Sequence, residues 1–281
     1  MQLPFELDLS GKTVVVTGGG GVLCGVFARA LGECGANVAV LDLRLDAAEK
    51  IAEEILKNGG KAKGYEANVL EKASLEAARE KILADFGTCD ILINGAGGNN
   101  PKGTTTKEYF DEGDLEKDDL VTFFDLDPSG VEFVFNLNFL GTLLPTQVFA
   151  KDMIKKGTVI NISSMNSFTP LTKIPAYSGA KAAVSNFTKW LAVHFSKVGI
   201  RVNAIAPGFF VTDQNRALLF DADGNPTPRT EKILNATPMG RFGEAEELVG
   251  TLLWLVNDKA SGFVNGTVIP VDGGFSAYSG V

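Results

Sequence analysis

Short apolar runs alternate with longer amphipathic segments along the chain. The clearest runs, residues 14–16 and 38–41, are apolar at every position rather than at every second one. Strands of a parallel sheet that is covered on both faces have this pattern. The alternation of such strands with helices predicts right-handed βαβ units, and therefore a doubly wound parallel α/β sheet with helices on both faces.

Seven segments are predicted to be strands, and helices are expected after the first two of them. The expected strands are residues 13–17, 37–42, 61–67, 90–94, 158–163, 200–206 and 267–271. The expected helices are residues 22–34 and 46–57. We expect one Rossmann-type domain over residues 1–281, because the length suits one large domain and no internal repeat or linker interrupts it.

Two segments lack this regular alternation, residues 98–127 and residues 209–237. The first is rich in glycine, threonine, asparagine and acidic residues, and the second follows the sixth expected strand. Ligands of doubly wound folds bind at the carboxyl ends of the strands, and long loops in compact domains are usually functional. We therefore expect both segments to cover a substrate, with plain solvent-exposed loops as the alternative.

Composition narrows the classes of function. The net charge of -8 argues against nucleic acid or an anionic membrane as the main partner. Neither an uninterrupted apolar span nor a signal-peptide pattern occurs, so we expect no membrane segment. Cys24, Cys34 and Cys89 lack CxxC spacing, and no cluster of histidine and carboxylates suggests a metal. A reducing cytoplasm fits these cysteines best.

A nucleotide site is expected directly after the first strand. Four consecutive glycines, residues 18–21, follow Thr17 and precede the first helix. Glycines there let the backbone approach a pyrophosphate, and the helix N-terminus favours its charge. Asp42 ends the second strand, where a carboxylate accepts hydrogen bonds from the adenosine ribose and repels a 2′-phosphate. This predicts NAD(H), while Arg44 keeps NADP(H) open as the less favoured cofactor.

Tyr177 and Lys181 are four residues apart on an amphipathic segment, so they share one face of a helix. A lysine beside a phenol stabilises the phenolate and should lower the tyrosine pKa from about 10. Such a tyrosine can donate a proton to a carbonyl or accept one from an alcohol. The spacing alone also fits an ordinary amphipathic helix, so the surrounding motifs must decide.

The order of the motifs resembles the short-chain dehydrogenase/reductase family over nearly the whole chain. These motifs are Thr17-Gly18, Asn94-Gly95-Ala96-Gly97, Asn138, Ser164, Tyr177, Lys181, Pro207-Gly208 and Val271-Asp272-Gly273-Gly274. The resemblance implies a Rossmann fold of about seven strands and an enzyme that transfers hydride with a nicotinamide cofactor. It also implies a homotetramer formed through the helices that carry Asn138 and Tyr177.

The resemblance further implies roles for individual residues. Tyr177 would be the general acid/base, and Ser164 would hydrogen-bond the substrate oxygen. Lys181 would hold the nicotinamide ribose and tune Tyr177, while Asn138 would anchor a water in a proton relay. The implied cofactor contacts are Thr17, Gly18, Gly20, Gly21, Val22, Leu23, Asp42, Asn68, Val69, Asn94, Ala96, Gly97, Tyr177, Lys181, Pro207, Gly208, Phe210 and Thr212.

Three departures from the family pattern concern the cofactor side. Val22 and Cys24 stand at the second and third glycine positions of the family's TGxxxGxG turn. Gly95 stands where the family usually has a second asparagine, and Asn68 where an aspartate usually contacts adenine. We expect Cys24 to be a small packing residue rather than a catalytic thiol.

The remaining stretches resemble one branch of the family, the D-mannonate oxidoreductases or fructuronate reductases. The implied reaction is reversible hydride transfer between NADH and the ketone of D-fructuronate, which gives D-mannonate. A polyhydroxy acid needs amide and hydroxyl partners and a cation for its carboxylate. The candidate substrate contacts are Asn99, Met165, Asn166, Gln214, Asn215 and Arg216, with Lys102, Lys173 and Arg229 as further cations.

Other functions stay open at this point. A reductase of another keto-sugar acid or polyol, such as gluconate, would use the same residues. A catalytically silent nucleotide-binding protein is disfavoured, because Asn138, Ser164, Tyr177 and Lys181 are all present. A 3-oxoacyl reductase would have no need for the polar loop residues. His194 lies 17 residues after Tyr177, about 25 Å along a helix, and is too distant for the chemistry.

Overall fold

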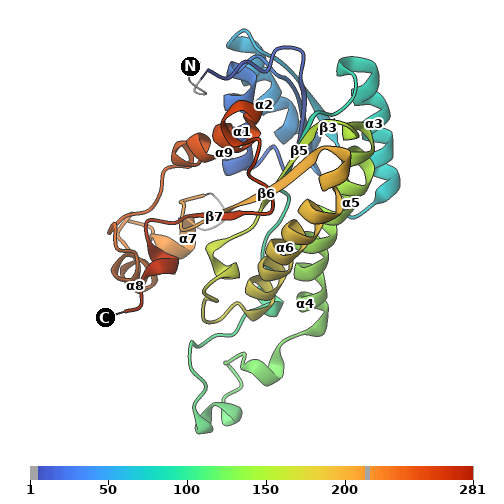
Figure 1. Cartoon of the computed structure of the whole chain (residues 1–281). Helices are drawn as coiled ribbons and strands as arrows, with labels where there is room; N and C mark the ends of the chain where they lie inside the picture. Colours follow the sequence, from blue (N-terminus) through green and yellow to red (C-terminus); the bar gives the residue numbers. More distant parts are fainter. Residues whose placement is uncertain (1–5, 213–215, 281) are drawn as a thin grey trace.

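The computed structural model, which describes residues 6–212 and 216–280, contains one sheet of seven parallel strands with helices on both faces (Figure 1). The strand order is β3-β2-β1-β4-β5-β6-β7. The strands are β1 Thr13–Thr17, β2 Asn37–Asp42, β3 Lys61–Glu66, β4 Ile91–Asn94, β5 Gly157–Ile162, β6 Ile200–Pro207 and β7 Val268–Val271. The predicted fold class is confirmed, and every predicted strand end lies within one residue of the observed one.

The helices extend the expected pattern. The two predicted helices are present, although the first ends one residue earlier and the second begins one residue earlier than expected. The helices are α1 Val22–Glu33, α2 Leu45–Lys57, α3 Lys72–Phe86, α4 Pro128–Phe135, α5 Gly141–Phe149, α6 Pro175–His194, α7 Arg216–Leu219, α8 Pro228–Ala236, α9 Val249–Val256 and α10 Asp258–Ser261.

Coverage of both faces explains why the central strands are apolar throughout. Val14 and Val16 of β1 belong to a core cluster that they share with α1, α2 and α9. Val15, between them, belongs to the opposite cluster, to which α3, α5 and α6 contribute. All three side chains are fully buried. Since successive side chains of a strand point to opposite faces, neither face leaves room for a polar residue.

Helices α4 and α5 are joined by a π-helical turn, Asn136–Leu140, into one continuous run. Extended by the 3-10 turn Ala150–Met153, the run Pro128–Met153 is long and apolar enough to cross a membrane by length and composition, with a mean hydropathy of 1.3 over its most apolar window. Half of that window is buried inside the structure, where α5 packs against α3 and α4 against α6. Core helices of soluble proteins meet the same criterion.

The carboxyl ends of β1 and β4 form the topological switch point, because β2 and β3 continue the sheet on one side and β5 to β7 on the other. Ligands of doubly wound folds bind at this point. The segment 98–127 leaves the sheet here and extends beyond it as a series of short 3-10 turns (Figure 1). The backbone of Thr105 donates to the carbonyl of Lys173 at 2.8 Å, which ties this segment to the loop before α6.

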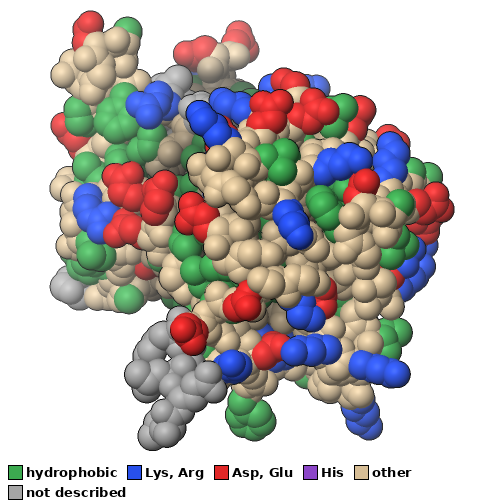
Figure 2. Space-filling view, turned by 90° about the horizontal axis from the view of Figure 1, so that it is seen from above, with side chains coloured by type: hydrophobic (Ala, Val, Ile, Leu, Met, Phe, Trp, Pro, Cys, Tyr) green, Lys and Arg blue, Asp and Glu red, His purple; other side chains and the backbone are tan. Residues whose placement is uncertain are grey.

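Acidic and basic side chains are interspersed on the face that Figure 2 shows. Neither sign of charge forms a broad patch on this face.

Candidate active site

The glycine turn between β1 and α1 brings two loops into close contact. Gly18 has a φ of +63°, and a Cβ built on it would lie 2.9 Å from Cα of Ala96. A Cβ on Gly20 would lie 2.6 Å from Cβ of Ala47 and 3.0 Å from Oδ2 of Asp42. Side chains at these positions are therefore excluded, and the bare backbone at the N-terminus of α1 can approach a diphosphate.

Asp42 is held at the end of β2, beside this turn. Its Oδ2 accepts a hydrogen bond from the backbone nitrogen of Gly20 at 3.1 Å, and its Oδ1 accepts one from that of Arg44, also at 3.1 Å. The Arg44 side chain is exposed. The structure thus fixes a carboxylate next to the glycine turn, as the sequence-based hypothesis of a ribose contact requires.

The unusual residues of the turn occupy different surroundings. Val22 is 38% exposed at the start of α1, whereas Cys24 is buried in the core cluster. A Cβ on Gly95 would lie only 2.0 Å from Sγ of Cys24. Burial also raises the pKa of the Cys24 thiol to about 12, so it is neutral and unreactive. The departures at positions 24 and 95 are thus linked, because the Cys24 thiol occupies the space that a side chain at position 95 would need.

Thr17 joins the loops that follow β1 and β4. Its hydroxyl accepts hydrogen bonds from the backbone nitrogens of Gly95 at 3.1 Å and Ala96 at 3.4 Å. Asn94, by contrast, donates its amide to Thr146 and Asn161, at 2.9 Å each, inside the protein. The Asn94 amide nitrogen therefore binds the protein interior. Any cofactor contact at this position would involve the Asn94 backbone or its unpaired Oδ1 atom.

The other predicted cofactor contacts lie around the same edge of the sheet. Asn68 follows β3, and its amide is engaged with Leu70 and Glu71. Gly208 follows β6, and a Cβ there would lie 2.5 Å from Cα of Asp272. The remaining members are Leu23, Val69, Pro207, Phe210 and Thr212. Contact of these residues with a cofactor stays a prediction.

Ser164, Tyr177 and Lys181 meet at the carboxyl end of β5 and the first two turns of α6. The Ser164 hydroxyl lies close enough to the Tyr177 phenol to lower its pKa. The Lys181 side chain is buried, and its Nζ donates to the carbonyl of Ile162 at 2.8 Å. The same Nζ lies 5.7 Å from the centre of the Tyr177 ring. The predicted catalytic residues are thus together.

The protonation of these groups differs from the expectation. Burial raises the pKa of Tyr177, and the neighbouring Ser164 hydroxyl offsets this only in part. Burial also lowers the pKa of Lys181 to about 8. The prediction that Lys181 brings the tyrosine pKa below its ordinary value is therefore wrong for the protein alone. Both groups are desolvated in one site, and desolvation favours the neutral form of each.

Asn138 lies within the π-helical turn between α4 and α5. Its Nδ2 donates to the carbonyls of Val134 and Gly98 at 2.7 Å each, and its Oδ1 accepts from the nitrogen of Gly98 at 3.2 Å. A Cβ on Gly97 would lie 2.6 Å from Oδ1 of Asn138 and 3.1 Å from Nζ of Lys181. Asn138 thus fixes the loop after β4 beside the buried lysine, and such π-turns are frequent at functional sites.

The predicted substrate contacts are distributed unevenly. Met165 and Asn166 are buried directly after Ser164, and Oδ1 of Asn166 has no hydrogen-bond partner. Asn99 donates to Oγ1 of Thr104 at 3.1 Å, and Arg216 is exposed at the start of α7. Gln214 and Asn215 lie outside the described residues.

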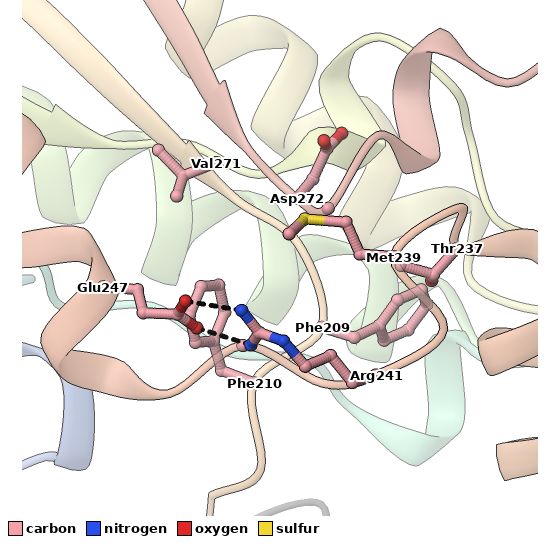
Figure 3. A pocket seen from close by; sticks show the side chains of 10 residues that line it. Phe209, Phe210, Thr237, Met239, Arg241, Glu247, Val271 and Asp272 are labelled. Carbon is pink, nitrogen blue, oxygen red and sulfur yellow. Dashed lines mark hydrogen bonds and ion pairs between the residues drawn. The ribbon is translucent and has the colours of Figure 1, made fainter.

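Two cavities lie beyond β6 and share Phe209. The smaller, of about 90 Å³, is lined by Arg241 and Glu247, which form two hydrogen bonds of 2.6 and 2.7 Å (Figure 3). The larger, of about 340 Å³, lies between the loop before α6 and helix α8. Glu108 and Lys232 line this larger cavity, and the sequence analysis missed both because no motif marks them. Within the described residues, no group of three histidine, cysteine or carboxylate side chains could hold a metal.

Comparison with known proteins agrees with this geometry. Residues 12–222 match the short chain dehydrogenase family. An uncharacterized oxidoreductase of Haemophilus influenzae is 64% identical over 100% of this chain and 99% of its own length. The chain belongs to the short-chain dehydrogenase family, and it is an oxidoreductase.

Two solved structures have the same fold. One, from Haemophilus influenzae, is provisionally named a D-mannonate oxidoreductase and has NAD bound. It is 64% identical over 100% of both chains, with a TM-score of 0.94. The other is a gluconate 5-dehydrogenase from Burkholderia cenocepacia in complex with NADP and tartrate. It is 30% identical over 98% of this chain and 99% of its own, with a TM-score of 0.83.

Burial of Lys181 predicts a pH-dependent contribution to stability. Between pH 8 and the ordinary lysine pKa, the unfolded chain binds a proton that the folded protein has released. The free energy of unfolding of the wild type should therefore rise from pH 8 to pH 10, relative to Lys181→Met, by roughly 1–3 kcal/mol. Urea unfolding of both proteins without cofactor measures this, and a difference that is constant with pH would contradict it.

The contact between Gly95 and Cys24 predicts energetic coupling. Gly95→Ala should destabilise the protein by about 1–3 kcal/mol, because its Cβ meets Sγ of Cys24. The loss should be smaller in a Cys24→Ala background, although the carbonyl of Thr17 at 2.9 Å still opposes the methyl group. A double-mutant cycle by urea unfolding should give a coupling above about 0.5 kcal/mol. Cys34→Ala is the control, and it should be additive with Gly95→Ala.

Proposed function

We propose that this oxidoreductase interconverts D-fructuronate and D-mannonate with NAD(H). The observation that carries the proposal is the convergence of Ser164, Tyr177 and Lys181, together with a partly cationic cavity whose wall, Leu171–Ile174, ends three residues before Tyr177. A polyhydroxy acid would find hydroxyl and amide partners next to Ser164, where Oδ1 of Asn166 is buried and unpaired. The provisional name of the Haemophilus influenzae structure supports D-mannonate as one member of this pair.

The residues would divide the chemistry as follows. The nicotinamide, when bound, supplies or accepts the hydride. Ser164 and Tyr177 would hydrogen-bond the reacting oxygen, and Tyr177 would donate its proton to that oxygen during reduction of the ketone. In the reverse direction, the same phenol oxygen would accept the proton of the alcohol. Lys181 would supply a positive charge below about pH 8, where its amine is protonated.

The surroundings of Asp42 at the glycine turn support NAD(H) over NADP(H) as the cofactor. The Asp42 carboxylate is fixed by the backbone of the glycine turn, where it would accept hydrogen bonds from the ribose and oppose a 2′-phosphate. The Haemophilus influenzae structure contains NAD, and the gluconate 5-dehydrogenase structure contains NADP. The latter relative also supports a second candidate, reduction of another keto-sugar acid of the gluconate type.

We further propose that two loops cover the substrate and that the protein forms a homotetramer. Segments 98–127 and 209–237 would cover the substrate, since residues of both line the larger cavity. A homotetramer would use the outer face of α6, where Trp190 is 55% exposed and stacks on His194 at 4.6 Å. The three cysteines are free, which supports a reducing compartment such as the cytoplasm.

The substrate is tested by NADH oxidation at 340 nm with D-fructuronate, D-tagaturonate and 5-ketogluconate. We expect D-fructuronate to have the highest kcat/KM. Tyr177→Phe should lower kcat by about 10²–10⁴-fold, because it removes the proton donor and keeps the ring. The variant should still bind NADH as the wild type does. Preferred turnover of another keto acid would keep the mechanism and replace the substrate, whereas NADH binding without any turnover would contradict the proposed function.

The role of Asp42 is tested by Asp42→Asn. The amide can still accept hydrogen bonds from Gly20 or Arg44, but it no longer repels a phosphate. The ratio of kcat/KM for NADPH to that for NADH should rise by about tenfold, which corresponds to about 1.4 kcal/mol. Asp46→Asn, in the first turn of α2, is a control that removes a nearby charge. An unchanged ratio in Asp42→Asn would refute the role.

A further inference from the structure

The larger cavity is built from elements that are distant in sequence. The loop Leu171–Ile174 forms one wall and immediately precedes α6, in which Tyr177 is the third residue. Helix α8 forms the facing wall, and Phe209 and Phe275 complete the apolar lining. Its volume of about 340 Å³ lies in the range of small-molecule sites, about 300–1,000 Å³. One wall of the cavity is therefore continuous in sequence with the helix that carries Tyr177, and the volume suits part of a substrate.

Three cations and one carboxylate line this cavity. Lys232 donates to Oε1 of Glu108 at 2.9 Å. Within residues 6–212 and 216–280, no carboxylate lies within ion-pairing distance of Lys173 or Arg229. The pKa of Glu108 is lowered first by its hydrogen bond to Lys232 and further by the charges of Lys173 and Arg229. The cavity thus has an excess of positive charge although the whole chain has a net charge of -8.

The backbone around these cations is specialised. Lys173 has a φ of +64°, a left-handed conformation that is uncommon for a residue with a long side chain. Its carbonyl is held by the Thr105 nitrogen, so the segment 98–127 maintains this conformation. Arg229 lies in the first turn of α8, where the helix dipole adds to the positive potential rather than opposing it. Backbone strain of this kind is often retained at ligand sites.

We propose that Lys173 and Arg229 bind the carboxylate of the sugar-acid substrate in this cavity, and that Glu108 competes for the same positive charge through Lys232. This inference rests on the proposed function, since it concerns the acid group of that substrate. Two other cations of this region already pair with carboxylates. Arg241 pairs with Glu247 in the smaller cavity, and Lys102 pairs with Asp127 at 3.2 Å.

The test compares variants in KM for D-fructuronate and in the dissociation constant of D-mannonate for the enzyme–NADH complex, measured by calorimetry. Arg229→Gln and Lys173→Asn should each raise both constants about tenfold or more, with kcat little changed. Asparagine tolerates the left-handed conformation, so the second variant removes the charge without adding strain. Arg229→Lys should restore part of the affinity. Lys102→Gln is the matched control and should leave both constants unchanged.

Glu108→Gln distinguishes electrostatic competition from a purely structural role. Removal of its charge should lower the dissociation constant of D-mannonate, and added salt should reduce the difference from the wild type. A structural role of Glu108 would instead raise the constant. Thermal unfolding of each variant shows that it is folded.

The outcomes separate this inference from the proposed function. If the wild type reduces D-fructuronate and the variants Arg229→Gln and Lys173→Asn keep its KM, the carboxylate site is refuted and the function stands. If the wild type does not reduce D-fructuronate, but binds D-gluconate with an affinity that depends on Arg229 and Lys173, the carboxylate site is supported and the substrate assignment fails.

Discussion

The loops that leave β1 and β4 pack against each other so closely that the rest of the site depends on their contact. Gly18 approaches Ala96 without space for a Cβ. The Thr17 hydroxyl accepts hydrogen bonds from the backbone nitrogens of Gly95 and Ala96 in the loop after β4. This contact sets the start of α1, which would face a diphosphate, and the path of the chain toward Gly97 and Asn138. Gly95 has no side chain, and the Cys24 thiol fills the space that one would occupy. The two loops therefore stay in contact, although a thiol replaces a side chain at position 95.

A buried lysine is the second constraint, and it follows from the first. Lys181 lies where the loop after β4, the π-helical turn and β5 meet, and one carbonyl, that of Ile162, accepts its hydrogen bond. Removal of an ammonium group from water is costly, which explains why its pKa falls to about 8. The protein alone therefore keeps Tyr177 neutral and brings the titration of Lys181 close to pH 8. The neutral phenol can donate a proton during reduction, and the charge of Lys181 can respond to an anion or dipole that enters the cleft.

The parts of the fold that could be predicted are those governed by local pattern. The central strands could be predicted to within one residue because burial on both faces leaves an uninterrupted apolar run, as in Val14 to Val16. The 3-10 turns of segment 98–127 could not be predicted, because tertiary contacts such as that between Thr105 and Lys173 hold them. Spacing correctly placed Tyr177 beside Lys181. It could not give the direction of the tyrosine pKa shift, since burial is not visible in a spacing of four residues.

The cavity beside α8 shows why the substrate side is the hardest part to foresee. Lys173 and Arg229 could be named as candidate cations from their loops, but Glu108 and Lys232 are 124 residues apart and no motif joins them. A cation on the surface of an acidic protein can pair with a carboxylate, as Arg241 and Lys102 do, and the paired charge attracts a further anion less strongly. A site for an acid must therefore keep cations apart from the protein's own carboxylates. Two features achieve this separation. The strained backbone at Lys173 holds its amine in the cavity wall. The ion pair with Lys232 occupies Glu108, which is the competing carboxylate of this cavity.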